Sequence, residues 1–300
     1  MTNLNQNKNR RLIMKEYKDG HYTGERALFR IQDAKIENCL FDDGESPLKE
    51  ARNLRLDHVT FGYKYPLWYG KNHEVRNSKF LLMSRSGIWY TDDSRFLHCD
   101  IIAPKEFRRC KNIYLEDVVF HDASETLWTC QNITLKDVTA KGDYLLKDSF
   151  DVHVDNLKLD GNYAFDGGKN LHVVNSVLNT KDAFWNCENV YLENCTIKGE
   201  YFGWNSKNIY MKNCTISSHQ GFCYMKNIRM ENCRIEDSDL IFEYCEDIDC
   251  DIDSDLGSVK NPISGILRCR SVKEMIRDDE RIDLSRIHVC VKDGESYHEI

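Results

Sequence analysis

The chain has 300 residues, a formal net charge of −8 at pH 7 and 30% charged residues. Its acidic balance argues against nucleic acid as a partner, because phosphate backbones bind basic surfaces. It contains no apolar run of 18 residues, so we expect neither a transmembrane helix nor a membrane partner.

The first segment is polar and basic. Residues 1–18 contain no apolar stretch of the kind that forms a secretory signal, so we expect none. We expect residues 1–14 to be disordered, and Met14 is an alternative start. Residues 15–269 then form a repeat region whose first residues, up to Ile31, cap its beginning. The repeat is lost after Cys269, so residues 270–300 are expected to form a C-terminal cap, as exposed sheet edges need cover.

A repeat of about 19 to 20 residues organises residues 15–269. All five tryptophans share one position of it, with spacings of 21, 39, 57 and 19 residues, or one, two, three and one repeats; they are Trp68, Trp89, Trp128, Trp185 and Trp204. We call this position the tryptophan column. In successive repeats it reads Trp68, Trp89, Arg108, Trp128, Lys147, Asp166, Trp185, Trp204, Cys223, Glu243.

Each repeat is predicted to contain several short strands. Asn189–Asn194 and Asn208–Asn213 alternate apolar and polar residues, which is the period of a half-buried strand. A second strand such as Cys195–Ile197 follows, then a polar turn and a third short strand such as Ala183–Trp185. Leucine-rich repeats need a leucine-rich consensus, and helical repeats need a longer period with a 3.6-residue pattern. The sequence has neither. The sequence therefore predicts an all-β fold, a single-stranded parallel β-helix of about 11–12 coils.

Columns of equivalent residues follow from the repeat. One interior column is expected to contain Ile113, Ile133, Val152, Leu171, Val190, Ile209 and Ile228, and another Phe107, Leu127, Leu146, Phe165, Phe184, Phe222 and Phe242. Asparagines such as Asn175, Asn194, Asn213 and Asn232 occupy a corner between two strands. Since asparagine tolerates left-handed backbone, we expect a ladder of amide hydrogen bonds there.

The thirteen cysteines also fall in columns. Cys195, Cys214 and Cys233 share one column, and Cys110, Cys130 and Cys187 another. Stacked parallel side chains suit reduced thiols better than disulfides, which indicates a cytoplasmic protein. The sequence has no Cys-x-x-Cys motif and its histidines are scattered, so we expect neither a metal nor a cofactor.

The tryptophan column is the candidate site, since Trp185 should point outward when Phe184 points inward. Aromatic faces interleaved with charges suit stacking on sugar rings, so the candidate binding residues are Trp68, Trp89, Arg108, Trp128, Trp185 and Trp204. Two alternatives stay open: the column packs under turns as secondary core, or it binds another protein.

Catalysis is a further possibility. Glycoside hydrolysis needs two carboxyl groups, which Asp166 and Asp182 on adjacent coils would supply. β-Elimination of uronates needs a base such as Lys147. Asp166, Asp182 and Lys147 are therefore the candidate catalytic residues, and whether the chain is an enzyme stays open.

Six stretches carry a specific resemblance: Tyr65–Tyr69, Gly87–Tyr90, Pro104–Arg109, Glu125–Trp128, Lys181–Asn189 and Lys260–Gly265. They resemble one uncharacterised bacterial family, the domain of unknown function numbered 3737, and the resemblance runs from about Lys15 to the C-terminus. That family is similar to the pectin-lyase-like superfamily, which implies a right-handed helix. It brings no assigned catalytic residues, and fold alone does not give function.

Two hypotheses follow. The first is a carbohydrate-binding or carbohydrate-active β-helix that holds an oligosaccharide along the tryptophan column. The second is a non-catalytic scaffold whose aromatic strip contacts a protein, which leaves a homo-oligomer open.

Overall fold

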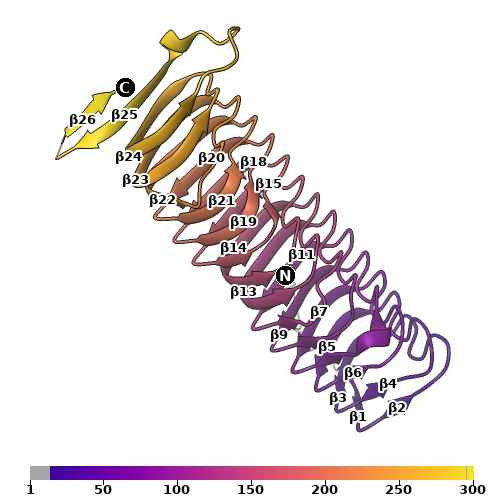
Figure 1. Ribbon diagram of the computed structural model, residues 1–300. Coiled ribbons are helices and arrows are strands. Elements are labelled where there is room, and N and C mark those ends of the chain that lie inside the picture. The colour runs from indigo at the N-terminus through magenta and orange to yellow at the C-terminus, as the bar shows by residue number, and fades with distance from the viewer. Residues whose placement is uncertain (1–13, 295) are drawn as a thin grey trace, which may run out of the picture.

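The protein is a rod of stacked turns made of short parallel strands (Figure 1). The computed structural model describes residues 14–294 and 296–300, so most of the segment expected to be disordered lies outside the described residues. The predicted parallel β-helix is confirmed. It has about 15 turns, more than the eleven or twelve predicted.

The longest sheet runs along one side of the rod with its strands in parallel register. Its strands are β1 (Lys15–Lys18), β3 (Gln32–Glu37), β5 (Arg52–Asp57), β7 (Lys71–Arg76), β9 (Asp92–Leu97), β11 (Lys111–Glu116), β13 (Gln131–Lys141), β14 (Phe150–Asp160), β15 (Lys169–Val174), β18 (Glu188–Glu193), β20 (Lys207–Lys212), β22 (Lys226–Glu236), β23 (Glu246–Lys260), β24 (Gly265–Ile276) and β25 (Ile287–Asp293). The first residues of the predicted N-terminal cap thus form a strand of this sheet.

A second side carries shorter strands, and the long strands β13, β14, β22, β23 and β24 bend into it. The short strands are β2 (His21–Tyr22), β4 (Leu40–Phe41), β6 (Thr60–Phe61), β8 (Lys79–Phe80), β10 (Asp100–Ile101), β12 (Val119–Phe120), β16 (Val177–Asn179), β17 (Asp182–Ala183), β19 (Thr196–Phe202) and β21 (Thr215–Gly221). Two 3₁₀ helices, η1 (Leu82–Ser84) and η2 (Leu284–Arg286), interrupt turns. At the C-terminal end β26 (Ser296–Glu299) pairs antiparallel with β25.

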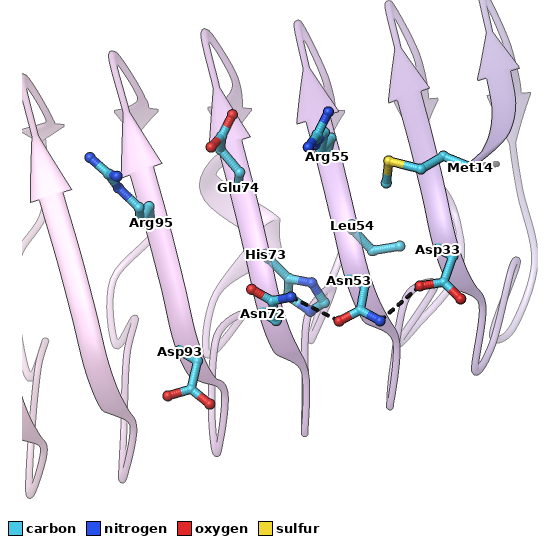
Figure 2. Close-up of a pocket in the computed structure, with 10 residues that line it drawn as sticks. All are labelled: Met14, Asp33, Asn53, Leu54, Arg55, Asn72, His73, Glu74, Asp93 and Arg95. Atoms are coloured by element: carbon cyan, nitrogen blue, oxygen red, sulfur yellow. Dashed lines mark hydrogen bonds between the residues drawn. The ribbon is translucent and has the colours of Figure 1, made fainter. Parts of the chain in front are cut away.

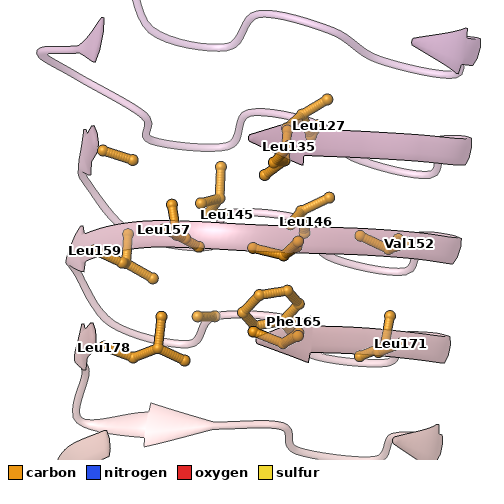
Figure 3. Packing of buried hydrophobic residues seen from close by; sticks show 14 of the residues in the cluster. Leu127, Leu135, Leu145, Leu146, Val152, Leu157, Leu159, Phe165, Leu171 and Leu178 are labelled. Atoms are coloured by element: carbon orange, nitrogen blue, oxygen red, sulfur yellow. The ribbon is translucent and has the colours of Figure 1, made fainter. Parts of the chain in front are cut away.

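The buried apolar residues form one core that runs from Ile31 to Val289. Figure 3 shows part of this core around Leu146 and Phe165. Alternation places one side chain in two inside, so Val152 of β14 meets Leu171 of β15 in register. Every member of the two predicted apolar columns is buried. Each turn buries its apolar face only against its neighbours, which is why one regular pattern serves the whole chain.

Two asparagine ladders run along the corners of the rod. The predicted ladder is confirmed, because the Asn213 side-chain amide donates to Asn194 and the Asn232 amide donates to Asn213. A second ladder, which sequence reasoning missed, lies at the start of the long strands. There Asn72 donates to Asn53 and Asn53 donates to Asp33 (Figure 2). Ladder residues have left-handed backbone, such as Asn213 at φ 53°, which asparagine tolerates.

The third side of each turn, which carries the tryptophan column, differs from the prediction. A third short strand was expected over Ala183–Trp185, but the strand β17 ends at Ala183. Left-handed residues then alternate with extended ones: Phe184 has φ 58° and Asn186 has φ 54° on either side of Trp185. This alternation still sends Phe184 inward and Trp185 outward, as predicted.

The cysteine columns consist of free thiols, and twelve of the thirteen cysteines are buried. Several of these thiols make hydrogen bonds to backbone groups of a neighbouring turn. Cys130 Sγ donates to the Phe107 carbonyl at 3.4 Å and accepts from the Cys110 N–H at 3.5 Å. Ser149, at the same position of the next turn, donates to Leu127 and accepts from Cys130 N–H. Cysteine and serine are therefore interchangeable here for a structural reason.

Candidate functional site

In the first part of the tryptophan column, the side chains of successive turns pack against one another. The Trp68 and Trp89 rings stack with centroids 5.4 Å apart and planes 9° apart. The guanidinium carbon of Arg108 lies 4.5 Å from the Trp89 ring and 4.7 Å from the Trp128 ring, so it is held between two indoles. Each cation–π contact stabilises this stack.

The indole N–H groups of these tryptophans are also used. Trp89 Nε1 donates to the Lys105 carbonyl at 2.8 Å, and Trp128 Nε1 donates to the Tyr144 carbonyl at 2.6 Å. Trp68 does the same with Ser86. Since their faces and polar edges contact the protein itself, Trp68, Trp89, Arg108 and Trp128 form a packed segment of the column.

The middle of the column is an ion pair. Lys147 Nζ binds the Asp166 carboxylate on the next turn. This hydrogen bond and the charge of Asp166 raise the pKa of Lys147 from its ordinary value. A lysine that is held protonated is a poor general base.

Beyond the ion pair the column opens into a pocket of about 280 Å³. Its lining combines four aromatic side chains with one acid, one base and one amide: Tyr163, Lys181, Asp182, Trp185, Tyr201, Trp204 and Gln220. The Trp185 and Trp204 rings lie 6.2 Å apart and are inclined at 48°, so they do not stack flat on each other. Trp185 is 37% exposed.

The aromatic row continues past this pocket toward the C-terminus. Tyr224 lies 5.5 Å from Trp204 and Tyr244 lies 5.4 Å from Tyr224, measured between ring centroids. Tyr224 is 46% exposed. Trp185, Trp204, Tyr224 and Tyr244 therefore form a row of aromatic rings over four successive turns.

Asp182 is the buried acid of the pocket, with 7% of its surface exposed. Burial raises the pKa of Asp182, the Lys181 charge opposes this, and the charges of Glu200 and Asp166 add to it. Lys181, which also lines the pocket, has its Nζ 3.5 Å from the Glu200 carboxylate. A carboxyl group with a raised pKa can donate or accept a hydrogen bond in a dry site.

The structure thus brings together three of the predicted site residues, Asp182, Trp185 and Trp204. Asp166 is near enough to affect Asp182 electrostatically but is bound to Lys147. Sequence reasoning did not single out Lys181 or Gln220. Gln220 donates to Glu243 at 3.3 Å, a contact that only the fold brings about.

A second hollow, of about 430 Å³, lies on strands β3, β5, β7 and β9 (Figure 2). Its lining is polar and of mixed charge, with Asp33, Arg55, Glu74, Asp93 and Arg95 among its residues. His73 of β7 lies beneath this hollow and is only 2% exposed. It occupies the interior column position that Leu54 holds one turn earlier. None of the described residues that line this hollow is a phenylalanine, tyrosine or tryptophan, so it is a weaker candidate for a sugar site.

Among residues 14–294 and 296–300, no group of three histidine, cysteine, aspartate or glutamate side chains could hold a metal ion. Over the same residues, none of the helices has the length and apolar character needed to cross a membrane.

Residues 15–290 match the family described as "Protein of unknown function (DUF3737)". The chain belongs to the DUF3737 family. None of the curated proteins matches this DUF3737 chain. One solved structure to which it is similar is a double mutant of the tailspike protein of E. coli bacteriophage HK620. The identity is 10%, the alignment covers 90% of the DUF3737 chain and 68% of the tailspike chain, and the TM-score is 0.37.

Proposed function

We propose that this DUF3737 protein binds an oligosaccharide in the pocket between Trp185 and Trp204. The observation that carries the proposal is the aromatic pocket whose lining includes one buried acid, Asp182. Aromatic faces bind the apolar faces of sugar rings, and a few polar groups orient the hydroxyls.

The row of rings that leads away from the pocket supports a ligand longer than one sugar. Tyr224 and Tyr244 extend the surface formed by Trp185 and Trp204 over two further turns. Trp185 and Tyr224 are the exposed members of this row, whereas Trp204 and Tyr244 are half-buried. Contiguous exposed apolar surface marks binding sites. We infer that the pocket holds one sugar unit and that the row supports its neighbours.

The proposal divides the predicted site residues into two groups. Trp185, Trp204 and Asp182 would contact the glycan. Trp68, Trp89, Arg108 and Trp128 would stabilise the fold, because their faces already contact one another. If chemistry takes place, Asp182 is the first candidate for a general acid, since its pKa is raised by burial. Lys147 and Asp166 would instead hold each other in place.

The test is binding to an array of neutral and acidic oligosaccharides and to insoluble polysaccharides. We expect saturable binding that Trp185→Ala and Trp204→Ala each abolish. Phe150→Ala is the matched control, because Phe150 is as exposed as Trp185, at 38%, but lies outside the pocket. Binding that survives both tryptophan substitutions would refute the proposal.

A second candidate is a protein-interaction scaffold, which the exposure of Trp185 and Tyr224 favours. Light scattering tests it in the form of self-association. An oligomer that Trp185→Ala and Tyr224→Ala dissociate, with no glycan bound by the native protein, would favour the scaffold over the glycan site.

We also propose a reducing compartment such as the cytoplasm. The support is chemical: the thiols serve as hydrogen-bonding groups between turns, a role that oxidation would remove. Counting free thiols in the unfolded protein after isolation from its native cells tests this, and thirteen reactive thiols are expected. Fewer would argue for an oxidising compartment.

A further inference from the structure

Two histidines face each other on the outer surface of the long sheet. His153 of β14 and His172 of β15 are register partners on adjacent strands. Their Nδ1 atoms lie 3.3 Å apart, and the rings are inclined at 77°. His153 is exposed, so the pair is open to solvent. The pair lies on strands β14 and β15, whereas the tryptophan column lies on the third side of each turn.

The distance between the two nitrogen atoms is informative. Hydrogen bonds that involve nitrogen donors are usually about 2.9 Å long, so 3.3 Å is a weak contact. Two histidine nitrogens that bind one tetrahedral zinc ion at about 2.0 to 2.1 Å are separated by roughly 3.3 to 3.4 Å. The pair therefore has the spacing of one edge of a zinc coordination tetrahedron.

We propose that His153 and His172 together bind a divalent transition-metal ion of the kind that prefers imidazole, such as Zn²⁺, through their Nδ1 atoms. The structure supplies the two ligands on rigid strands, because each histidine lies in a continuous part of the sheet. Preorganised ligands on rigid elements lower the cost of binding.

The rest of the coordination shell would be water or an external ligand. No third histidine, cysteine, aspartate or glutamate joins the pair within the part of the chain that the structure describes. The strand neighbours in register are Thr134 on one side and Tyr191 on the other, and the Tyr191 ring lies 4.7 Å from the His172 ring. A site with two protein ligands leaves coordination positions open, in contrast to a closed structural zinc site.

The experiment is a titration of the full chain, without a histidine tag, with Zn²⁺ in a calorimeter. A parallel titration with Co²⁺ is followed by visible absorption, which reports coordination geometry. We expect one saturable site, and we expect His153→Ala and His172→Ala each to weaken binding by roughly tenfold or more. The double variant should bind Zn²⁺ with the same low affinity as either single variant, because one remaining histidine cannot chelate the ion.

His121→Ala is the matched control, because His121 is also exposed but pairs with Asp100 rather than with a histidine. It should leave the affinity unchanged. His153→Gln, which keeps the size of the side chain, separates loss of a ligand from loss of folding. The proposal is overturned if no saturable site appears, or if binding is the same in both alanine variants as in the native protein. Glycan binding in the Trp185 pocket should not respond to any of these changes.

Discussion

Lys147 and Asp166 lie on adjacent turns at the same position of the repeat, and their side chains bind each other. This one contact divides the tryptophan column into a packed stretch before it and an open stretch after it. It also places two of the three candidate catalytic residues in a mutual contact, which leaves Asp182 as the carboxyl group that lines the aromatic pocket.

The ion pair is predicted to stabilise the fold. Its side chains are 30% and 17% exposed, so removal of one partner leaves a partly buried charge. We expect Lys147→Met and Asp166→Asn each to lower the free energy of unfolding by about 1 to 3 kcal/mol. Urea unfolding of both single variants and the double variant measures the coupling. Additive effects would show that the pair contributes nothing as a pair.

Tryptophans of the same column should respond differently to truncation. Trp89 is stacked between Trp68 and Arg108, so Trp89→Ala should lower the free energy of unfolding by about 3 kcal/mol. Trp185→Ala removes a more exposed ring and should cost less than about 1 kcal/mol. Chemical denaturation measures both. Equal losses in the two variants would contradict the division of the column.

The burial of His73 in the core leads us to expect a loss of stability in acid. Burial, and to a lesser degree the Arg52 charge, lower the pKa of His73 to about 3, so it stays neutral in the folded protein. The unfolded chain binds a proton below about pH 6.5, so stability is complete above that pH and falls as the pH drops toward 3. His73→Leu, which copies Leu54 at the equivalent position, should remove this loss.

The difference in free energy of unfolding between His73→Leu and the native protein should therefore favour the variant more strongly in acid. Near pH 5 the additional difference is on the order of 2 kcal/mol relative to pH 8. Urea unfolding at both pH values measures it. His219→Leu serves as a control because His219 is exposed. If the variant and the native protein differ in free energy of unfolding by the same amount at both pH values, the pKa of His73 is not lowered by folding.

The thiol columns predict which cysteine substitutions are tolerated. Cys130→Ser preserves a donor to Phe107 and an acceptor for Cys110, as Ser149 shows one turn later. Cys130→Ala leaves the buried Cys110 N–H without its partner, which costs about 1 to 3 kcal/mol. Thermal unfolding compares the two variants. If alanine were tolerated as well as serine, the hydrogen-bonding role of the thiol would be wrong.

The sequence was sufficient for the fold because the same residue types recur at the same position of each turn. Apolar residues at Ile113 and its equivalents, and asparagines at Asn213 and its equivalents, each define a column directly. The number of turns was underestimated, in part because the ends of the rod carry these markers incompletely. β1 has Lys15 at the position equivalent to Ile113, and β25 keeps an apolar residue there, Ile287, after the break at Gly265. Right-handedness, bacterial origin and membership of the pectin-lyase-like superfamily stay predictions from resemblance.

The candidate site was harder to predict because column membership does not determine how neighbouring side chains contact each other. Trp89 and Trp204 occupy the same position of the repeat. Trp89 has a flat neighbour in Trp68 and a cation in Arg108, whereas Trp204 has an inclined ring in Trp185 and an acid nearby in Asp182. These differences depend on ring orientations, which the repeat pattern does not encode.

The left-handed residues on either side of the column have an evolutionary consequence. Phe184 and Asn186 fix the path of the chain around Trp185 through their own backbone, so the side chain between them has little influence on the turn. The same frame accepts an indole, a guanidinium, an ammonium group or a carboxylate at neighbouring levels. Such an arrangement resembles a display array, in which binding preferences can be altered one level at a time without redesign of the support.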